Sequence, residues 1–159
     1  MARRPPRYDA VIAAPFGRLG IRTRDGRLAE IDFLSARARL RAPQDAFTRR
    51  VCRALRAYFA DPRRPLRLPL ALAGSAHQQR VWRALTRIPP GEVRSYGELA
   101  RRLGSSARAI GGACRRNPIP IVVPCHRVAA ASGPGGFMGR VSGTPLAIKR
   151  WLLAHEAGR

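Results

Sequence analysis

Residues 95–128 read SYGELARRLGSSARAIGGACRRNPIPIVVPCHRV, and this stretch decides the fold of the second half of the chain. Its first part predicts two short helices, YGELARRL and ARAIGGACRR, and Ser95 with Glu98 forms a capping box at the start of the first. Only the turn Gly104-Ser105-Ser106 separates them. Two short helices joined by a three-residue turn that contains glycine are typical of the helix-turn-helix, a DNA-binding motif.

The second helix of this pair carries Gly111, Gly112 and Ala113 near its middle. Each glycine costs a helix about 1 kcal/mol relative to alanine, so the pair needs a reason. One interpretation is structural: a neighbouring helix packs closely against this face. The other is functional: the face must approach something bulky, such as a DNA groove. The sequence favours neither.

Cys125 ends the aliphatic run that follows the second helix. The run IPIVV predicts a buried strand, and Pro124 ends its ladder of hydrogen bonds because proline has no N–H to donate. Cys125 therefore lies at the mouth of a strand, where functional groups commonly emerge. A cysteine by itself is more often an inert core residue, but a nearby cation such as Arg127 favours the reactive thiolate.

His126 follows the cysteine directly, yet neighbours in a regular strand point to opposite faces. The two side chains can cooperate only if the backbone turns at Pro124-Cys125 or if a water molecule bridges them. Further along, Thr144 and Pro145 start a helix that ends near Glu156, a carboxylate that opposes the helix dipole. Glu156 is either a solvated helix end or an acid that reaches inward to orient His126.

The first third of the chain predicts a small β-rich subdomain with one helix. Its short apolar stretches are separated by Phe16-Gly17 and by Asp25-Gly26, and the second of these is a strong hairpin signal. Asp45 caps a helix over 46–60. The proline-rich residues 61–74 then read as a linker.

The domain that follows is predicted to be mostly helical. Ser75 and Gln78 form a capping box, and Pro89-Pro90-Gly91 stops the helix that they start. We therefore expect an α/β (α+β) fold, with an N-terminal α/β subdomain and linker at 1–74. The domain at 75–159 is expected to contain the helix-turn-helix and the active-site cysteine.

The charge of the chain points to a polyanionic partner. Its 159 residues hold 31 basic and 9 acidic side chains, for a formal net charge of +22. The codon bias of a GC-rich genome explains why Lys149 is the only lysine, but it does not explain the scarcity of acids. Nucleic acid is the first expectation, and an anionic membrane surface the second.

The cysteines and histidines indicate neither a disulfide framework nor a metal site. Cys52, Cys114 and Cys125 are odd in number and lack C-x-x-C spacing, and only three histidines accompany them. The start of the chain lacks an apolar segment of signal-peptide length, and no run reaches 18 apolar residues. We expect a cytoplasmic protein, nucleoid-associated if prokaryotic, without a metal and without membrane association.

The stretches SYGELARRL, ARAIGGACRRNPIPIVVPCHRV and LAIKRWLLAHE resemble the O6-alkylguanine–DNA alkyltransferase family over residues 75 to 156. The combination N-P-x-P-I-x-x-P-C-H-R-V with an upstream R-A-I-G is highly specific. The resemblance implies DNA repair without a cofactor or metal. The partner is double-stranded DNA that carries O6-alkylguanine, bound through its minor groove by a monomer. One alkyl group passes to the protein, and each protein molecule reacts only once.

The resemblance also implies roles for individual residues. Cys125 is the alkyl acceptor, His126 is its base through a bridging water, Glu156 orients the histidine and Asn117 is a hinge. Tyr96 helps to rotate the damaged nucleotide, and Arg108 enters the stack that the base vacates. The remaining DNA contacts are Gly111, Gly112, Ala113, Arg115 and Arg127, and the alkyl pocket is lined by Pro120, Phe137 and Met138.

Two features depart from the family pattern. His77 stands where an aromatic residue is usual, and we expect only a change in packing. Residues 133–145 do not align cleanly with the shorter loop of the family, so Phe137 or Met138 replaces its pocket-lining tyrosine.

Three other functions compete with alkyl transfer. A recognition module for alkylated DNA would lack the acceptor, but Cys125 is present. A helix-turn-helix regulator explains the charge but not PCHRV or Asn117. A thiol hydrolase that uses Cys125 and His126 lacks a recognisable oxyanion hole.

Overall fold

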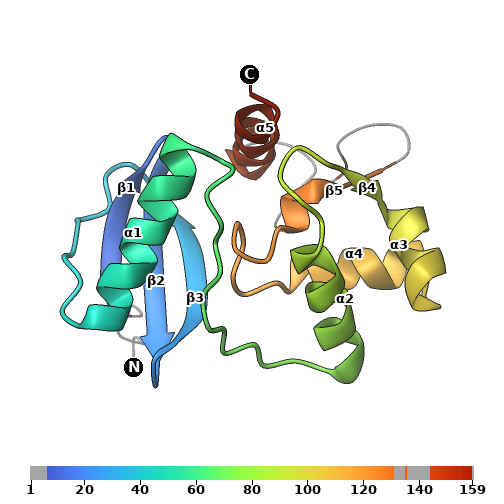
Figure 1. Cartoon of the computed structure of the whole chain (residues 1–159), viewed down its shortest axis with the longest axis horizontal. Helices are drawn as coiled ribbons and strands as arrows, with labels where there is room; N and C mark the ends of the chain where they lie inside the picture. The colour runs from blue at the N-terminus through green and yellow to red at the C-terminus, as the bar shows by residue number, and fades with distance from the viewer. Residues whose placement is uncertain (1–6, 131–134, 136–143, 159) are drawn as a thin grey trace, which may run out of the picture. The chain divides into compact units, whose positions relative to one another are not determined.

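The computed structural model describes residues 7–130, 135 and 144–158 (Figure 1). The chain divides into two compact units, Met1–Ala71 and Leu72–Arg159. The first is a sheet with a helix, and the second is mostly helical. This is the mixed α/β fold expected from the sequence. In the part of the chain that is described, no helix has the length and apolarity needed to cross a membrane.

The sheet of the first unit has three antiparallel strands in the order β1-β2-β3. They are β1 (Ala10–Ala14), β2 (Gly17–Arg24) and β3 (Arg27–Leu34). Asp25 and Gly26 join β2 to β3 with φ angles of 51° and 69°. Two consecutive positive φ angles give the tight turn whose twist matches that of a hairpin, so the hairpin expected at Asp25-Gly26 is confirmed.

Helix α1 (Ala46–Ala60) covers this sheet. Asp45 caps it as expected, because its carboxylate accepts a hydrogen bond of 2.8 Å from the N–H of Thr48. The side chains of Val51, Leu55 and Tyr58 are buried. Spacings of four and three residues place these three on one face, which packs toward the sheet.

The expected linker is bound to the edge of the sheet at residues 69–71. The N–H of Leu28 donates to the carbonyl of Pro69, and the N–H of Ala71 donates to the carbonyl of Leu28, both at 2.8 Å. Leu70 thus forms a parallel bridge with Leu28. Proline is tolerated at such an edge because only its carbonyl is used.

The second unit is built from α2 (Ala76–Thr86), α3 (Tyr96–Leu103), α4 (Ala107–Arg115) and α5 (Thr144–Glu156). Gly104 ends α3 in the left-handed conformation, with φ 61°, and the N–H of Ser105 donates to the carbonyl of Ala100. Because this turn ends α3, α4 can begin only three residues later, at Ala107. The predicted pair of short helices is therefore confirmed. His77 of α2 bonds the Ser105 hydroxyl at 2.8 Å, which ties α2 to the turn.

Residues 117–124 are not the strand that the run IPIVV predicts. They form a buried irregular loop, in which Ile121 has φ 75°. Three prolines deprive this short segment of N–H donors, so a ladder cannot form. The loop leads into a 3-10 turn, Cys125–Arg127, and then into β5 (Val128–Ala129), which pairs in parallel with β4 (Arg94–Ser95).

Candidate active site

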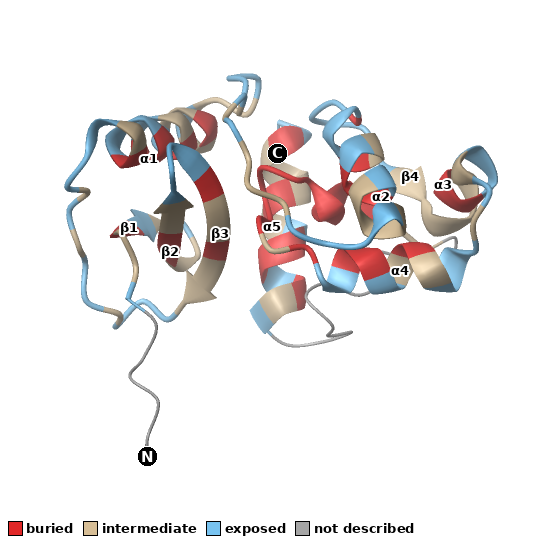
Figure 2. Ribbon diagram, turned by 90° about the horizontal axis from the view of Figure 1, so that it is seen from below, coloured by how far each residue is buried: buried red, intermediate tan, exposed pale blue. Residues whose placement is uncertain are grey.

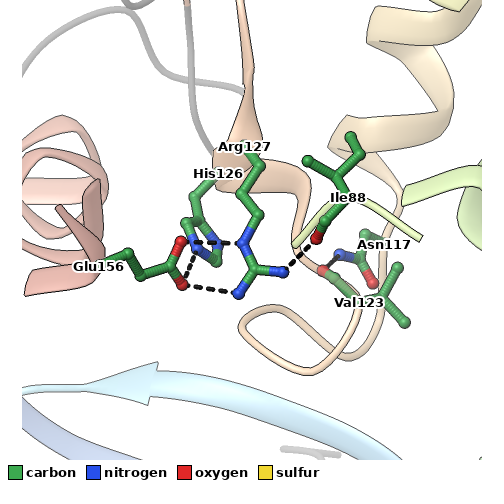
Figure 3. A network of polar contacts seen from close by, with 6 residues as sticks. All are labelled: Ile88, Asn117, Val123, His126, Arg127 and Glu156. Carbon is green, nitrogen blue, oxygen red and sulfur yellow. Dashed lines mark hydrogen bonds and ion pairs between the residues drawn. The ribbon is translucent and has the colours of Figure 1, made fainter. Parts of the chain in front are cut away.

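Cys125 is the first residue of the 3-10 turn and is 3% exposed. Asn117 holds the loop that precedes it. The Asn117 Nδ2 donates to the carbonyl of Val123 at 2.7 Å (Figure 3). The Asn117 Oδ1 accepts from the N–H of Ile119 at 2.9 Å. A left-handed β-branched residue such as Ile121 persists only where its surroundings fix it. Asn117 supplies that constraint from inside the loop.

The turn places His126 beside the end of α5. Its Nε2 lies 2.8 Å from Oε2 of Glu156, and both side chains are buried. Glu156 is therefore no solvated helix end. Arg127 closes the same network, because its Nε and Nη2 donate to the two Glu156 oxygens at 2.8 Å and its Nη1 donates to the carbonyl of Ile88 at 2.6 Å (Figure 3).

The protonation states follow from this network. Burial alone raises the pKa of Glu156, but hydrogen bonds from Arg127 and His126 outweigh it and hold that pKa well below its usual range. Burial lowers the pKa of His126, so its imidazole is neutral. Since an ionised carboxylate only accepts, the Nε2 carries the proton. The Nδ1 is buried without a hydrogen-bond partner among the described residues, and its lone pair can accept a proton.

The thiol of Cys125 is protonated at rest. Burial raises its pKa to about 11, while the Asn117 side chain and the Lys149 ammonium act in the opposite direction. The thiolate, not the thiol, is the nucleophile. The site therefore needs a base close to the cysteine, and the neutral His126 is the residue of the turn that can serve.

Sequence reasoning missed the position of Lys149. Its side chain is fully buried, and its Nζ donates to the carbonyl of Val128 at 2.7 Å. Burial lowers its pKa, whereas the thiols of Cys125 and Cys114 raise it. The signal was present: the only lysine in a chain that otherwise uses arginine occupies a core position of α5.

Pairing of β4 with β5 brings Tyr96 to the cysteine. Tyr96 begins α3 directly after β4, and β5 directly follows the 3-10 turn. Burial and then the thiols of Cys114 and Cys125 raise the pKa of Tyr96 to about 12. Gly135, with φ 74°, lies against the same ring, since a Cβ there would be 3.1 Å from Cε2 of Tyr96. A side chain at residue 135 would thus press on the tyrosine.

One exposed face of α4 carries two arginines with a glycine between them, and we call it the bare face because the glycine has no side chain. Arg108, Gly112 and Arg115 are exposed and spaced by four and three residues, so they share that face. A Cβ at Gly111 or Gly112 would meet nothing within 4 Å among the described residues. Close packing of a neighbouring helix therefore does not explain the glycines.

Other expected residues lie elsewhere. Ala113 is buried, and its carbonyl accepts from Nε1 of Trp82 at 2.9 Å. Arg127 is buried and donates to Glu156. The burial of Ala113 and Arg127 argues against the DNA contacts that the sequence predicted for them. Pro120 is buried in the loop before the cysteine. Phe137 and Met138 lie outside the described residues.

Comparison with known proteins identifies the family of the chain. Residues 76–158 match the family model described as "6-O-methylguanine DNA methyltransferase, DNA binding domain". The chain belongs to the 6-O-methylguanine DNA methyltransferase family. A methylated-DNA–protein-cysteine methyltransferase of Methanosarcina acetivorans is 38% identical over 156 residues, which cover 94% of this chain and 97% of the relative. The enzyme of that name from Mycolicibacterium paratuberculosis is 52% identical over 102 residues, 60% of this chain and 61% of its own length.

Solved structures of methyltransferases share the fold. The crystal structure of the O6-methylguanine methyltransferase of Mycobacterium tuberculosis has a TM-score of 0.79 and is 38% identical, covering 94% of this chain and 92% of its own. The complex of the Mycobacterium tuberculosis protein OGT with DNA has a TM-score of 0.77 at 40% identity, covering 93% of this chain and 91% of its own. The family thus accounts for both units of the chain.

Proposed function

We propose that this methyltransferase repairs duplex DNA by moving an alkyl group from the O6 atom of guanine to Cys125. The observation that carries the proposal is a buried thiol on the same turn as a neutral histidine, whose Nε2 is held by an ionised glutamate. Cys125, His126 and Glu156 all belong to the second unit of one chain. A monomer therefore holds the whole catalytic set.

The proposed reaction is a direct displacement. The thiol proton passes through a bridging water to Nδ1 of His126, and the thiolate sulfur attacks the alkyl carbon. The S–C bond forms as the O6–C bond breaks. The guanine anion that leaves takes up a proton from water, while His126 releases the proton it received and becomes neutral again. Asn117 and Lys149 stabilise the thiolate, since both lower the pKa of Cys125. A thioether is a poor leaving group, so each molecule acts once.

The substrate must leave the duplex before it reacts. The O6 atom lies at the base-pairing edge of a stacked guanine, where a buried thiol cannot reach it, and flipping a nucleotide costs a few kcal/mol of unstacking. We propose that the bare face of α4 enters the minor groove, that Tyr96 helps to rotate the nucleotide and that Arg108 fills the gap. The exposed side chain of Arg108 and the open space at Gly112 support this arrangement.

Stoichiometry tests the proposed function. The protein is incubated with a duplex that carries one O6-methylguanine, and the restored guanine is counted at several protein-to-DNA ratios. We expect one guanine per protein molecule and then no further conversion. Turnover beyond one, or binding without conversion, contradicts the proposal, and the second result would favour a recognition module or a DNA-binding regulator.

Arg108→Ala should slow transfer from duplex DNA about tenfold or more, because an inserted side chain offsets part of the unstacking cost and 1.4 kcal/mol corresponds to a factor of ten. Transfer from the free base O6-methylguanine should stay within about twofold, because the free base needs no flipping. Single-turnover rates on both substrates decide this. The matched control is Arg150→Ala, which removes an exposed arginine of α5. An equal loss on both substrates rules out the role of Arg108 in flipping.

Gly112→Leu should leave the protein folded and weaken its binding to duplex DNA about tenfold or more. Leucine is the better helix former by up to about 1 kcal/mol, residue 112 is exposed and a Cβ there meets nothing within 4 Å among the described residues, so the melting temperature should not fall. A bulky side chain on the bare face keeps α4 out of the groove. Fluorescence anisotropy and thermal melting provide the two readouts. Unchanged affinity would show that this face does not approach DNA.

A further inference from the structure

The outer face of α1 carries a row of arginines that the proposed reaction does not use. Arg49, Arg53 and Arg56 are exposed and spaced by four and three residues, which places them on one side of the helix. We call these three residues the α1 stripe. It extends about 10 Å along the axis, at 1.5 Å per residue. The opposite side of α1 is the buried face that packs toward the sheet (Figure 2).

The α1 stripe destabilises the free helix. Arginines four and three residues apart repel each other, at about 0.2–0.5 kcal/mol per pair. Arg49 also lies near the N-terminus of α1, where the helix dipole disfavours a cation. The sequence AFTRRVCRALRAYFA holds no acid, and no ion pair of the described residues includes a member of the stripe. The nearest acid in sequence, Asp45, bonds the N–H and hydroxyl of Thr48, and it attracts Arg49 without forming an ion pair with it.

Half of the net charge of the protein lies in the unit that carries the stripe. Residues 1–71 hold 17 arginines and 6 acidic residues, and residues 72–159 hold 14 basic and 3 acidic residues. Each unit therefore has a formal charge of +11, although the matched DNA-binding domain covers only 76–158. Codon bias can replace lysine with arginine, but it cannot align arginines on one helix face or remove acids from it.

We propose that the α1 stripe binds the phosphate backbone of duplex DNA, as a contact surface additional to the helix-turn-helix. Guanidinium groups donate paired hydrogen bonds to phosphate oxygens, and they do so without reading the base sequence. Binding relieves the repulsion within the stripe. The proposal rests on the proposed function only in taking duplex DNA, among polyanions, as the partner.

The salt dependence of DNA binding tests this surface. The triple variant Arg49→Gln, Arg53→Gln, Arg56→Gln is compared with Arg24→Gln, Arg27→Gln, Arg37→Gln, which removes three exposed arginines of the same unit. Affinity for an unmodified duplex is measured from low to moderate salt. A plot of log K against log salt loses about 0.9 in slope per phosphate contact. We expect the slope to fall by about 2.7 for the stripe variant, and by less than about 1 for the control.

Several results would overturn the proposal. An equal change of slope in both variants means that only total charge matters, and no change in either means that the stripe does not touch DNA. A stripe variant that loses binding to vesicles of anionic lipid, but not to the duplex, assigns the surface to membranes instead. If the triple variant fails to fold, Arg53→Gln alone should lower the slope by about 0.9. Absence of alkyl transfer in the unaltered protein would contradict the proposed function and leave the salt result standing.

Discussion

Cys125→Ala is expected to abolish alkyl transfer and to leave the affinity for duplex DNA within about twofold. The sulfur of Cys125 is the only atom of the proposed reaction that forms a bond to the alkyl carbon, so the loss should exceed about 10⁴-fold, the scale seen when an essential nucleophile is removed. Binding should persist because the proposed DNA contact is the exposed face of α4, whereas the thiol is buried. Single-turnover transfer and anisotropy on the same duplex measure the two effects.

The other two cysteines supply the matched controls. Cys52 and Cys114 are also buried, and burial raises the pKa of each thiol. Cys52→Ala and Cys114→Ala should retain transfer to the same end point, since neither thiol lies on the turn with His126. Transfer that survives in Cys125→Ala, or that disappears in Cys52→Ala with its fold intact, would refute the assignment of the acceptor.

Arg127→Met should lower the free energy of unfolding of the second unit by about 3–5 kcal/mol, because it leaves Glu156 buried without its guanidinium partner. Urea titration followed by tryptophan fluorescence measures this unit by itself, since Trp82 and Trp151 are the only tryptophans and both belong to it. Arg83→Met, an exposed arginine of α2, is the control and should change stability by less than about 0.5 kcal/mol.

The same network has a pH dependence of known sign. The pKa of Glu156 is lowered in the folded protein, so its contribution to stability is present above the ordinary value of 4.5 and is lost as the pH falls below it. Glu156→Gln should unfold more easily at neutral pH and lose less stability on acidification. For the first prediction, an Arg127→Met variant with the same free energy of unfolding as Arg83→Met would show that the buried network of Arg127 and Glu156 does not stabilise the end of α5.

Local sequence signals predicted the elements well and the loop before the cysteine badly. Capping residues and turn glycines predicted where α1 to α4 begin or end, because a cap acts on residues within one helical turn and can be read from the local sequence. The run IPIVV was read as a strand because its residues are apolar. Its fold instead depends on Asn117, whose side chain replaces the backbone ladder with bonds to Ile119 and Val123. A side chain that organises a loop leaves no periodicity to detect.

The sequence motif pointed to individual site residues, but it did not predict the contacts between residues that are far apart in the sequence. The motif PCHRV directed attention to Cys125 and His126, and the choice between two states of Glu156 needed the packing of α5 against the turn. Arg127 was expected on the DNA and lies in the core. Charge alone cannot tell a guanidinium that faces phosphate from one that faces a buried carboxylate 29 residues away.

Peptide mass mapping tests most directly whether Cys125 accepts the alkyl group. The protein is incubated with excess duplex carrying O6-methylguanine, its intact mass is measured, and the digested peptides are mapped. We expect the mass of one added methyl group per molecule, located on Cys125 alone. A methyl group on Cys52 or Cys114, or an unchanged mass with DNA bound, would contradict it.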